Sequence, residues 1–165
     1  MLLGADEATF RRGTRLGIDW GTTRVGVAAC DPDALLTYPV ETIPARNQQQ
    51  ALVRLKELVG EYEPIEIVMG LPLALDGRAA QAAEFIQEVA ELILGNSDVP
   101  LRLVDERLTT AAADKLLAHV DTRARRHVID QLAAVGILEG TLAYERHTGS
   151  PPGQLCVCSS TEGEE

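Results

Sequence analysis

Three apolar runs joined by very short turns open the chain and constrain its fold more than any other feature. The runs cover residues 14–20, 24–30 and 35–43, and the turns are Gly21-Thr22-Thr23 and Asp31-Pro32-Asp33. Strands joined by such tight turns can pair only in antiparallel fashion. Pro39 lies inside the third run, which indicates an edge strand or a β-bulge because proline cannot donate a ladder hydrogen bond.

The pattern then changes to alternating helices and strands. Apolar residues recur at helical spacing in residues 48–62, 78–94 and 123–146, and Thr109 is placed to cap a further helix reaching about His119. Residues 65–69 and 101–104 form short apolar runs of strand length. Repeated β-α-β order favours parallel strands with helices on both faces. We therefore predict an α/β fold with a mixed five-stranded sheet flanked by helices.

The length of the chain, 165 residues, suits a single domain. We place this domain at residues 14–147, with a flexible leader at residues 1–13. The remaining residues, 148–165, combine Gly, Pro, Ser and Glu, which predicts a disordered acidic tail.

Composition excludes several classes of protein. With 15 basic and 25 acidic residues the net charge is −10, which argues against a protein that coats polyanions generally. No apolar run approaches the ~20 residues of a membrane span, and the first residues do not resemble a secretory signal. Three cysteines with no such signal indicate a reducing, cytoplasmic location, and three dispersed histidines argue against structural zinc.

Two aspartates occupy positions where the pattern predicts burial. Asp19 lies in an apolar strand and shares its face with Gly17, which leaves space beside the carboxylate. Asp130 begins a helical stretch that is apolar or glycine on every side from residue 132 to residue 138. A buried carboxylate is costly unless it is paired or binds a metal ion.

A third acidic position follows the strand at residues 101–104. Asp105 and Glu106 point to opposite faces of that strand, so only one of them can join a given site. Each acid alone has a local explanation, such as pairing of Asp130 with Arg126. Together, acids from two strands and a helix can meet at one sheet edge, where hard oxygen ligands favour Mg²⁺ or Mn²⁺.

Four motifs, in order along the chain, resemble those of the YqgF/RuvX family of bacterial proteins, which are similar to RuvC-type resolvases and ribonuclease H. The motifs are Gly17-Ile18-Asp19-Trp20-Gly21-Thr22-Thr23-Arg24-Val25-Gly26-Val27-Ala28, Gly70-Leu71-Pro72 with Asp76-Gly77, Val104-Asp105-Glu106-Arg107-Leu108-Thr109-Thr110, and Asp130-Gln131-Leu132-Ala133-Ala134 with Ile137-Leu138. The resemblance covers almost all of the predicted domain.

The resemblance implies a ribonuclease H-like fold and a metal site formed by Asp19, Glu106 and Asp130. It also implies a nuclease, a hydrolase that cuts phosphodiester bonds in structured nucleic acid. The family is linked to maturation of the 5′ end of pre-16S ribosomal RNA, a step in ribosome biogenesis, and to Holliday junction resolution in DNA. The motifs do not choose between these roles. A resolvase is expected to act as a symmetric homodimer, whereas a trimming nuclease could act as a monomer.

Basic residues near these acids are candidates for substrate contact. The stretch from Arg123 to Arg126 ends one turn before Asp130 on the last helix, and Arg24 follows the first turn. Arg107 is a weaker candidate because it can pair with the acid beside it. Asp76, next to Gly77, reads first as a turn, and the resemblance adds a place along the active-site cleft.

Two other functions remain open from the sequence. Asp19-Trp20-Gly21-Thr22-Thr23 also resembles the first phosphate loop of actin-like sugar kinases, but those ATP phosphotransferases need two such domains. A non-catalytic RNA-binding module would need no set of three acids. The sequence therefore favours a nuclease dependent on Mg²⁺ or Mn²⁺.

Overall fold

Two antiparallel hairpins begin the fold, as the tight turns predict. In the computed structural model, which describes residues 10–73, 77–108 and 122–157, β1 (Arg15–Trp20) pairs with β2 (Arg24–Cys30), and β2 pairs with β3 (Thr37–Pro44). Val40 is the extra residue where the register of β3 shifts, directly after Pro39. The edge position and the bulge expected from Pro39 are both confirmed.

Parallel strands extend the sheet on the other side of β1. After α2 (Gln48–Tyr62) the chain enters β4 (Glu66–Leu71), and after α3 (Gly77–Gly95) it enters β5 (Leu101–Asp105). β4 lies parallel to both β1 and β5, so the carboxyl ends of these three strands meet at one edge. The segment predicted as a helix from Thr109 to about His119 lies outside the described residues.

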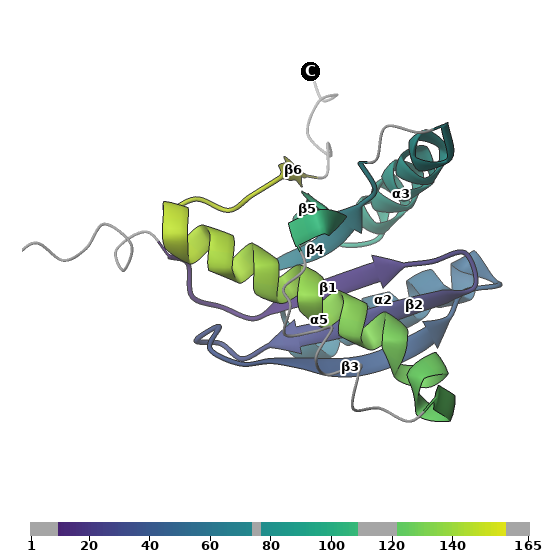
Figure 1. Ribbon diagram of the computed structural model, residues 1–165, viewed down its shortest axis with the longest axis horizontal. Coiled ribbons are helices and arrows are strands. Elements are labelled where there is room, and N and C mark those ends of the chain that lie inside the picture. The colour runs from purple at the N-terminus through teal and green to yellow at the C-terminus, as the bar shows by residue number, and fades with distance from the viewer. Residues whose placement is uncertain (1–9, 74–76, 109–121, 158–165) are drawn as a thin grey trace, which may run out of the picture.

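Helices cover both faces of the sheet, as the alternating pattern predicts (Figure 1). α2 and α3 pack on one face, and the long helix α5 (Thr122–Thr148) crosses the other. Within β1, Leu16 and Ile18 join the core beneath α2 and α3, so the alternate residues Gly17 and Asp19 face α5. No helix in the described part of the chain is both long enough and apolar enough to cross a membrane.

Helix α5 lies unusually close to the sheet because glycines remove the side chains beneath it. A Cβ atom on Gly26 of β2 would lie 1.9 Å from the carbonyl oxygen of Asp130, and one on Gly17 would lie 2.8 Å from that of Ala134. Hydrogen bonds hold the helix along β3 as well, from Gln131 to Thr42 Oγ1 at 3.0 Å among others. The register of α5 over β1 and β2 is therefore fixed by direct backbone contact.

The end of the predicted leader is part of the domain. Arg11 donates to Glu66 at 2.9 Å and to Glu145 at 2.6 Å, and the ring of Phe10 lies beneath the guanidinium of Arg146. The prediction of a flexible leader reaching residue 13 is therefore wrong for residues 10–13. The side chain of Arg11 is held by acids that come from β4 and α5, which the local sequence does not reveal. Residues 1–9 lie outside the described part.

In the described part of the chain the sheet has six strands, so the prediction of five is wrong. β6 (Gln154–Cys156) lies within the segment predicted to be a disordered tail and pairs antiparallel with β5. Gly149 and Gly153 adopt positive φ values of 75° and 77°, which turn the chain back after α5. Arg102 of β5 also donates to the carbonyl of Pro152 at 3.2 Å. Backbone hydrogen bonds to β5 stabilise this three-residue strand, which is too short to be stable on its own. Residues 158–165 lie outside the described part.

The close contact of α5 with β2 yields a stability test. We expect Gly26→Ala to lower the free energy of unfolding by about 3 kcal/mol or more, because its methyl group would meet backbone atoms that cannot rotate away. Gly60→Ala is the matched control: Gly60 is exposed in α2 and has nothing within 4 Å of the added Cβ. It should gain up to about 1 kcal/mol from helix propensity. Equal urea midpoints for the two variants would contradict the close packing.

Candidate active site

Asp19 lies one residue before the end of β1 and faces α5. Its neighbours along the chain, Ile18 and Trp20, are buried on the opposite face, whereas Asp19 itself is partly exposed at the sheet edge. Gly17 allows the backbone of α5 to approach on this face, so the carboxylate is covered by the helix without being sealed off. Main-chain alternation in β1 thus sets the direction of this side chain.

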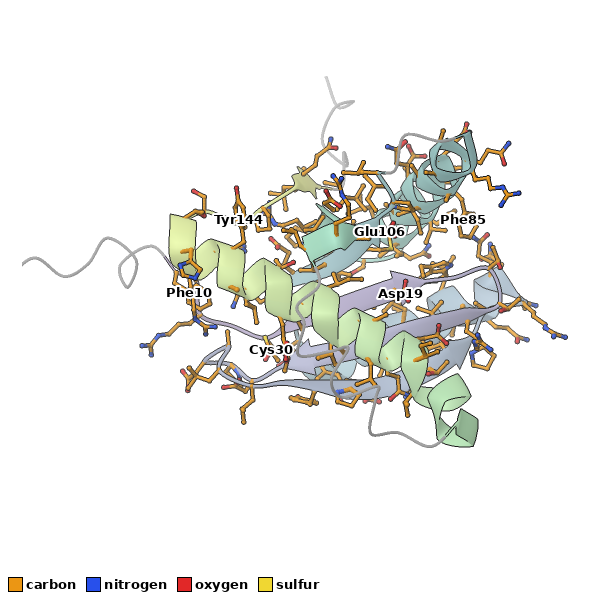
Figure 2. The ribbon with its side chains drawn as sticks, in the orientation of Figure 1. Phe10, Asp19, Cys30, Phe85, Glu106 and Tyr144 are labelled. Atoms are coloured by element: carbon orange, nitrogen blue, oxygen red, sulfur yellow. The ribbon has the colours of Figure 1, made fainter. Side chains whose placement is uncertain are left out.

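Asp105 and Glu106 separate at the end of β5, but not as the successive strand residues that the sequence suggested, because the strand ends at Asp105. Asp105 ends the strand and accepts a 2.6 Å ion pair from Arg107, which holds the pKa of Asp105 below its ordinary value. Glu106 opens the short 3-10 helix η1 (Glu106–Leu108) and is exposed at the same edge as Asp19. Figure 2 shows Asp19 and Glu106 near one another in the middle of the view.

Asp130 comes to the site from α5. Its carbonyl lies over Gly26, and its carboxylate accepts a hydrogen bond from Arg24 Nε at 2.9 Å. The local explanation offered by the sequence was pairing with Arg126, whose side chain lies outside the described part. The partner in the structure instead follows the β1–β2 turn, so the ion pair joins two segments far apart in the chain.

The charges of Asp130 and Glu106 act on Asp19. Burial of Asp19 raises the pKa of its carboxyl from 3.8 to about 6, and the negative charges of Asp130 and Glu106 add to this shift. No hydrogen bond from a described residue offsets the effect. Within the described part of the chain, no three His, Cys, Asp or Glu side chains lie close enough together to hold a metal ion as they stand. Asp130 is held by Arg24 instead.

A cleft of about 550 Å³ opens beside two of the acids, at the carboxyl ends of β1 and β4. Asp19 and Glu106 lie along it, and residues of the β1–β2 turn, of β4 and of the first half of α3 form its walls. The α3 residues are Arg78, Gln81, Ala82, Phe85 and Ile86. The sequence places Phe85 on the core-facing side of this helix. Periodicity reveals that side, but it does not reveal that half of it borders a cleft.

Of the remaining predicted site residues, Arg24 is paired with Asp130. Arg107 is paired with Asp105, and 71% of the Arg107 side chain is exposed. Asp76 lies outside the described residues, as do the side chains of Arg123 and Arg126. Their roles in substrate contact therefore stay predictions.

Comparison with known proteins decides the family. The family model of RuvX, described as Holliday junction resolvase, matches residues 13–144. The chain belongs to the RuvX family. It is 50% identical over 156 residues to a Streptomyces coelicolor relative, covering 91% of this chain and 92% of that one. A Mycolicibacterium smegmatis relative is 46% identical over 149 residues, covering 87% and 86%. Both relatives carry the name "Putative pre-16S rRNA nuclease".

Solved structures support the same fold. RuvC of Thermus thermophilus, in complex with a Holliday junction substrate, superposes with a TM-score of 0.57 at 15% identity, covering 84% of this chain and 98% of RuvC. This likeness confirms the ribonuclease H-like fold of the RuvX chain. The family and its named relatives indicate a nuclease, which is a hydrolase of phosphodiester bonds.

The raised pKa of Asp19 predicts a pH-dependent effect of its removal. The folded protein holds this proton more tightly than the unfolded chain, so the free energy of unfolding falls as the pH rises from about 3.8 to about 6. Asp19→Asn removes that loss. In EDTA we expect the variant to be more stable than wild type by on the order of 3 kcal/mol above pH 6, and equally stable below pH ~4.

Asp105→Asn is the matched control for this measurement. The pKa of Asp105 is lowered by Arg107, so its removal should cost stability above its folded pKa instead of adding it. Urea unfolding between pH 3.5 and 8 measures both differences. A stability difference for Asp19→Asn that did not change with pH would contradict the electrostatic account.

Proposed function

We propose that this RuvX protein is a metal-dependent nuclease that matures the 5′ end of pre-16S ribosomal RNA during ribosome assembly in the cytoplasm. The observation that carries the proposal is that the carboxyl of Asp19 lies within electrostatic reach of both Glu106 and Asp130 at the sheet edge. There, burial and the charges of Asp130 and Glu106 make ionisation of Asp19 unfavourable. Such uncompensated repulsion is typical of carboxylates that bind a cation.

The donor chemistry fits a divalent metal ion. Asp19, Glu106 and Asp130 offer only carboxylate oxygens, which suit Mg²⁺ or Mn²⁺. When bound, such an ion supplies an activated water and stabilises the leaving oxygen in phosphodiester hydrolysis. Asp19 must lose its proton to act as a ligand, so metal affinity should fall below pH ~6.

Arg24 balances the charge of this site in two ways. Its guanidinium holds Asp130 at 2.9 Å, while about half of its side chain is exposed. A cation that draws Asp130 away would free Arg24 for a substrate phosphate, for which its planar donor fork is well shaped. Arg24 would therefore neutralise Asp130 before binding and position the backbone afterwards.

Holliday junction resolution is the second candidate function. It is favoured by the description of the matching family, whereas the names of the relatives at 45–50% identity favour the ribosomal RNA. The two roles make different demands, because a junction has two equivalent strands and calls for a symmetric dimer. A trimming nuclease can act as a monomer.

Cleavage of two labelled substrates tests the function. A pre-16S leader RNA and a four-way DNA junction are incubated with Mg²⁺ or Mn²⁺ and with variants Asp19→Asn, Glu106→Gln and Asp130→Asn. We expect the RNA to be cut preferentially and each variant to lose at least ~100-fold in kcat, because each removes a charged ligand. Asp98→Asn is the control, because Asp98 is exposed in the loop before β5. This variant should cleave both substrates as the wild type does.

The outcomes separate the candidate functions. Paired symmetric cuts in the junction by a dimer, lost in the same variants, would replace RNA maturation with resolution. Full activity of Asp130→Asn would show that α5 contributes no ligand. Binding of RNA without any cleavage would favour the non-catalytic binding module.

A further inference from the structure

The cleft beside Asp19 and Glu106 has an apolar wall that phosphodiester hydrolysis does not require. Phe85, Ile86 and Ala82 of α3 contribute to this wall, together with Pro72 after β4 and Ile137 of α5. Phe85 is only partly buried and lies along the same cleft as Asp19 and Glu106, to their right in Figure 2. An apolar, aromatic surface therefore borders two acids that would hold the reacting phosphate.

The size and surface of the cleft indicate what kind of group fits there. Its volume of about 550 Å³ lies in the range of ligand pockets, ~300–1,000 Å³. The only large apolar faces of a nucleic acid are those of its bases, which stack on aromatic side chains when they leave the helix. Phosphates and sugars offer no flat apolar face of comparable size to stack on Phe85.

Polar groups at the mouth of the cleft complete this match. Arg78 and Gln81 precede Phe85 by seven and four residues, so all three lie on one face of α3. Both polar side chains are exposed, and Arg78 has no carboxylate partner among the described residues. A guanidinium and an amide can bind a base edge or a neighbouring phosphate.

We propose that this cleft holds one unstacked nucleobase next to the scissile phosphate, with Phe85 as its stacking surface and Arg78 and Gln81 at its mouth. The inference rests on the proposed nuclease function and adds a substrate requirement to it: the nucleotide beside the cut must be unpaired. The enzyme would then choose single-stranded or opened sites by the cost of unstacking a base.

A double-variant cycle on enzyme and substrate tests this subsite. The enzyme variant is Phe85→Leu, which keeps apolar volume but loses the ring. The substrate series carries a single abasic residue at each of the positions flanking the cut. For wild type, one flanking abasic site should raise KM about tenfold or more, as expected for loss of one stacked base. Phe85→Leu should also raise KM about tenfold on the intact substrate. On the sensitive abasic substrate, the same substitution should raise KM little further.

Controls separate a binding role from a structural one. Tyr144→Ala removes an exposed aromatic ring that lies far to the left of Phe85 in Figure 2. This variant should leave KM unchanged on every substrate. Phe85→Tyr should restore wild-type KM, because it restores the ring. Thermal unfolding of each variant excludes loss of the fold. Equal, additive losses for Phe85→Leu on intact and abasic substrates would overturn the base subsite.

A binding measurement keeps this inference distinct from the proposed function. Trp20 is the one tryptophan of the chain and lies along the cleft, so its fluorescence reports on base insertion. In EDTA, a short single-stranded RNA should change this fluorescence, and the abasic version should bind about tenfold more weakly. Equal affinities would overturn the subsite even where cleavage is normal. Absent cleavage with a preserved affinity difference would instead overturn only the nuclease.

Discussion

Direct backbone contact between α5 and the sheet is the constraint on which the site depends. Gly26 has no room for a Cβ beside the carbonyl of Asp130, and Gly17 has little beside Ala134. A helix held this closely cannot slide or rotate without steric clash, since protein interiors are close-packed. Asp130 is therefore placed over β2 and within electrostatic reach of Asp19. The glycines thus fix the position of α5, and this position sets the distance between Asp130 and Asp19.

In the described part of the chain, buried charges are paired at one end of β1 and unpaired at the other. At the amino end of β1, Arg15 and Glu145 are each 1% exposed and joined at 2.7 Å, while Glu66 pairs with Arg102 and Arg11. Burial alone would raise the pKa of Glu66, but hydrogen bonds from Arg102 and Arg11 hold it below the ordinary value. At the other end, Asp19 gains no such compensation and its pKa rises to about 6. The buried charges at the amino end of β1 are thus paired within the protein. At the other end the charge of Asp19 has no partner among the described residues, and a bound cation would supply one.

Sequence patterns predicted the elements with clear periodicity. The two hairpins, the bulge after Pro39 and the bounds of α2 all follow from local signals that the structure repeats. The errors fall where long-range contacts override composition. The sequence predicts that residues 154–156 belong to a disordered tail, but they pair with β5. It places Arg11 in a flexible leader, but Glu66 and Glu145 hold its side chain. Neither partner is near in the sequence, so no local pattern could reveal it.

For the candidate site, the sequence by itself determined which acids stand out. Asp19 and Asp130 are carboxylates within apolar patterns, and Asp105 and Glu106 directly follow an apolar run of strand length. Only the tertiary structure decided that Arg24 pairs with Asp130, that Glu106 acts on Asp19, and that Phe85 borders a cleft beside them. The physical reason is that charge interactions and cavities depend on distances between segments. Those distances are set by the packing of α3 and α5 on the sheet, whereas the sequence encodes directly only the direction in which each side chain leaves its own strand or helix.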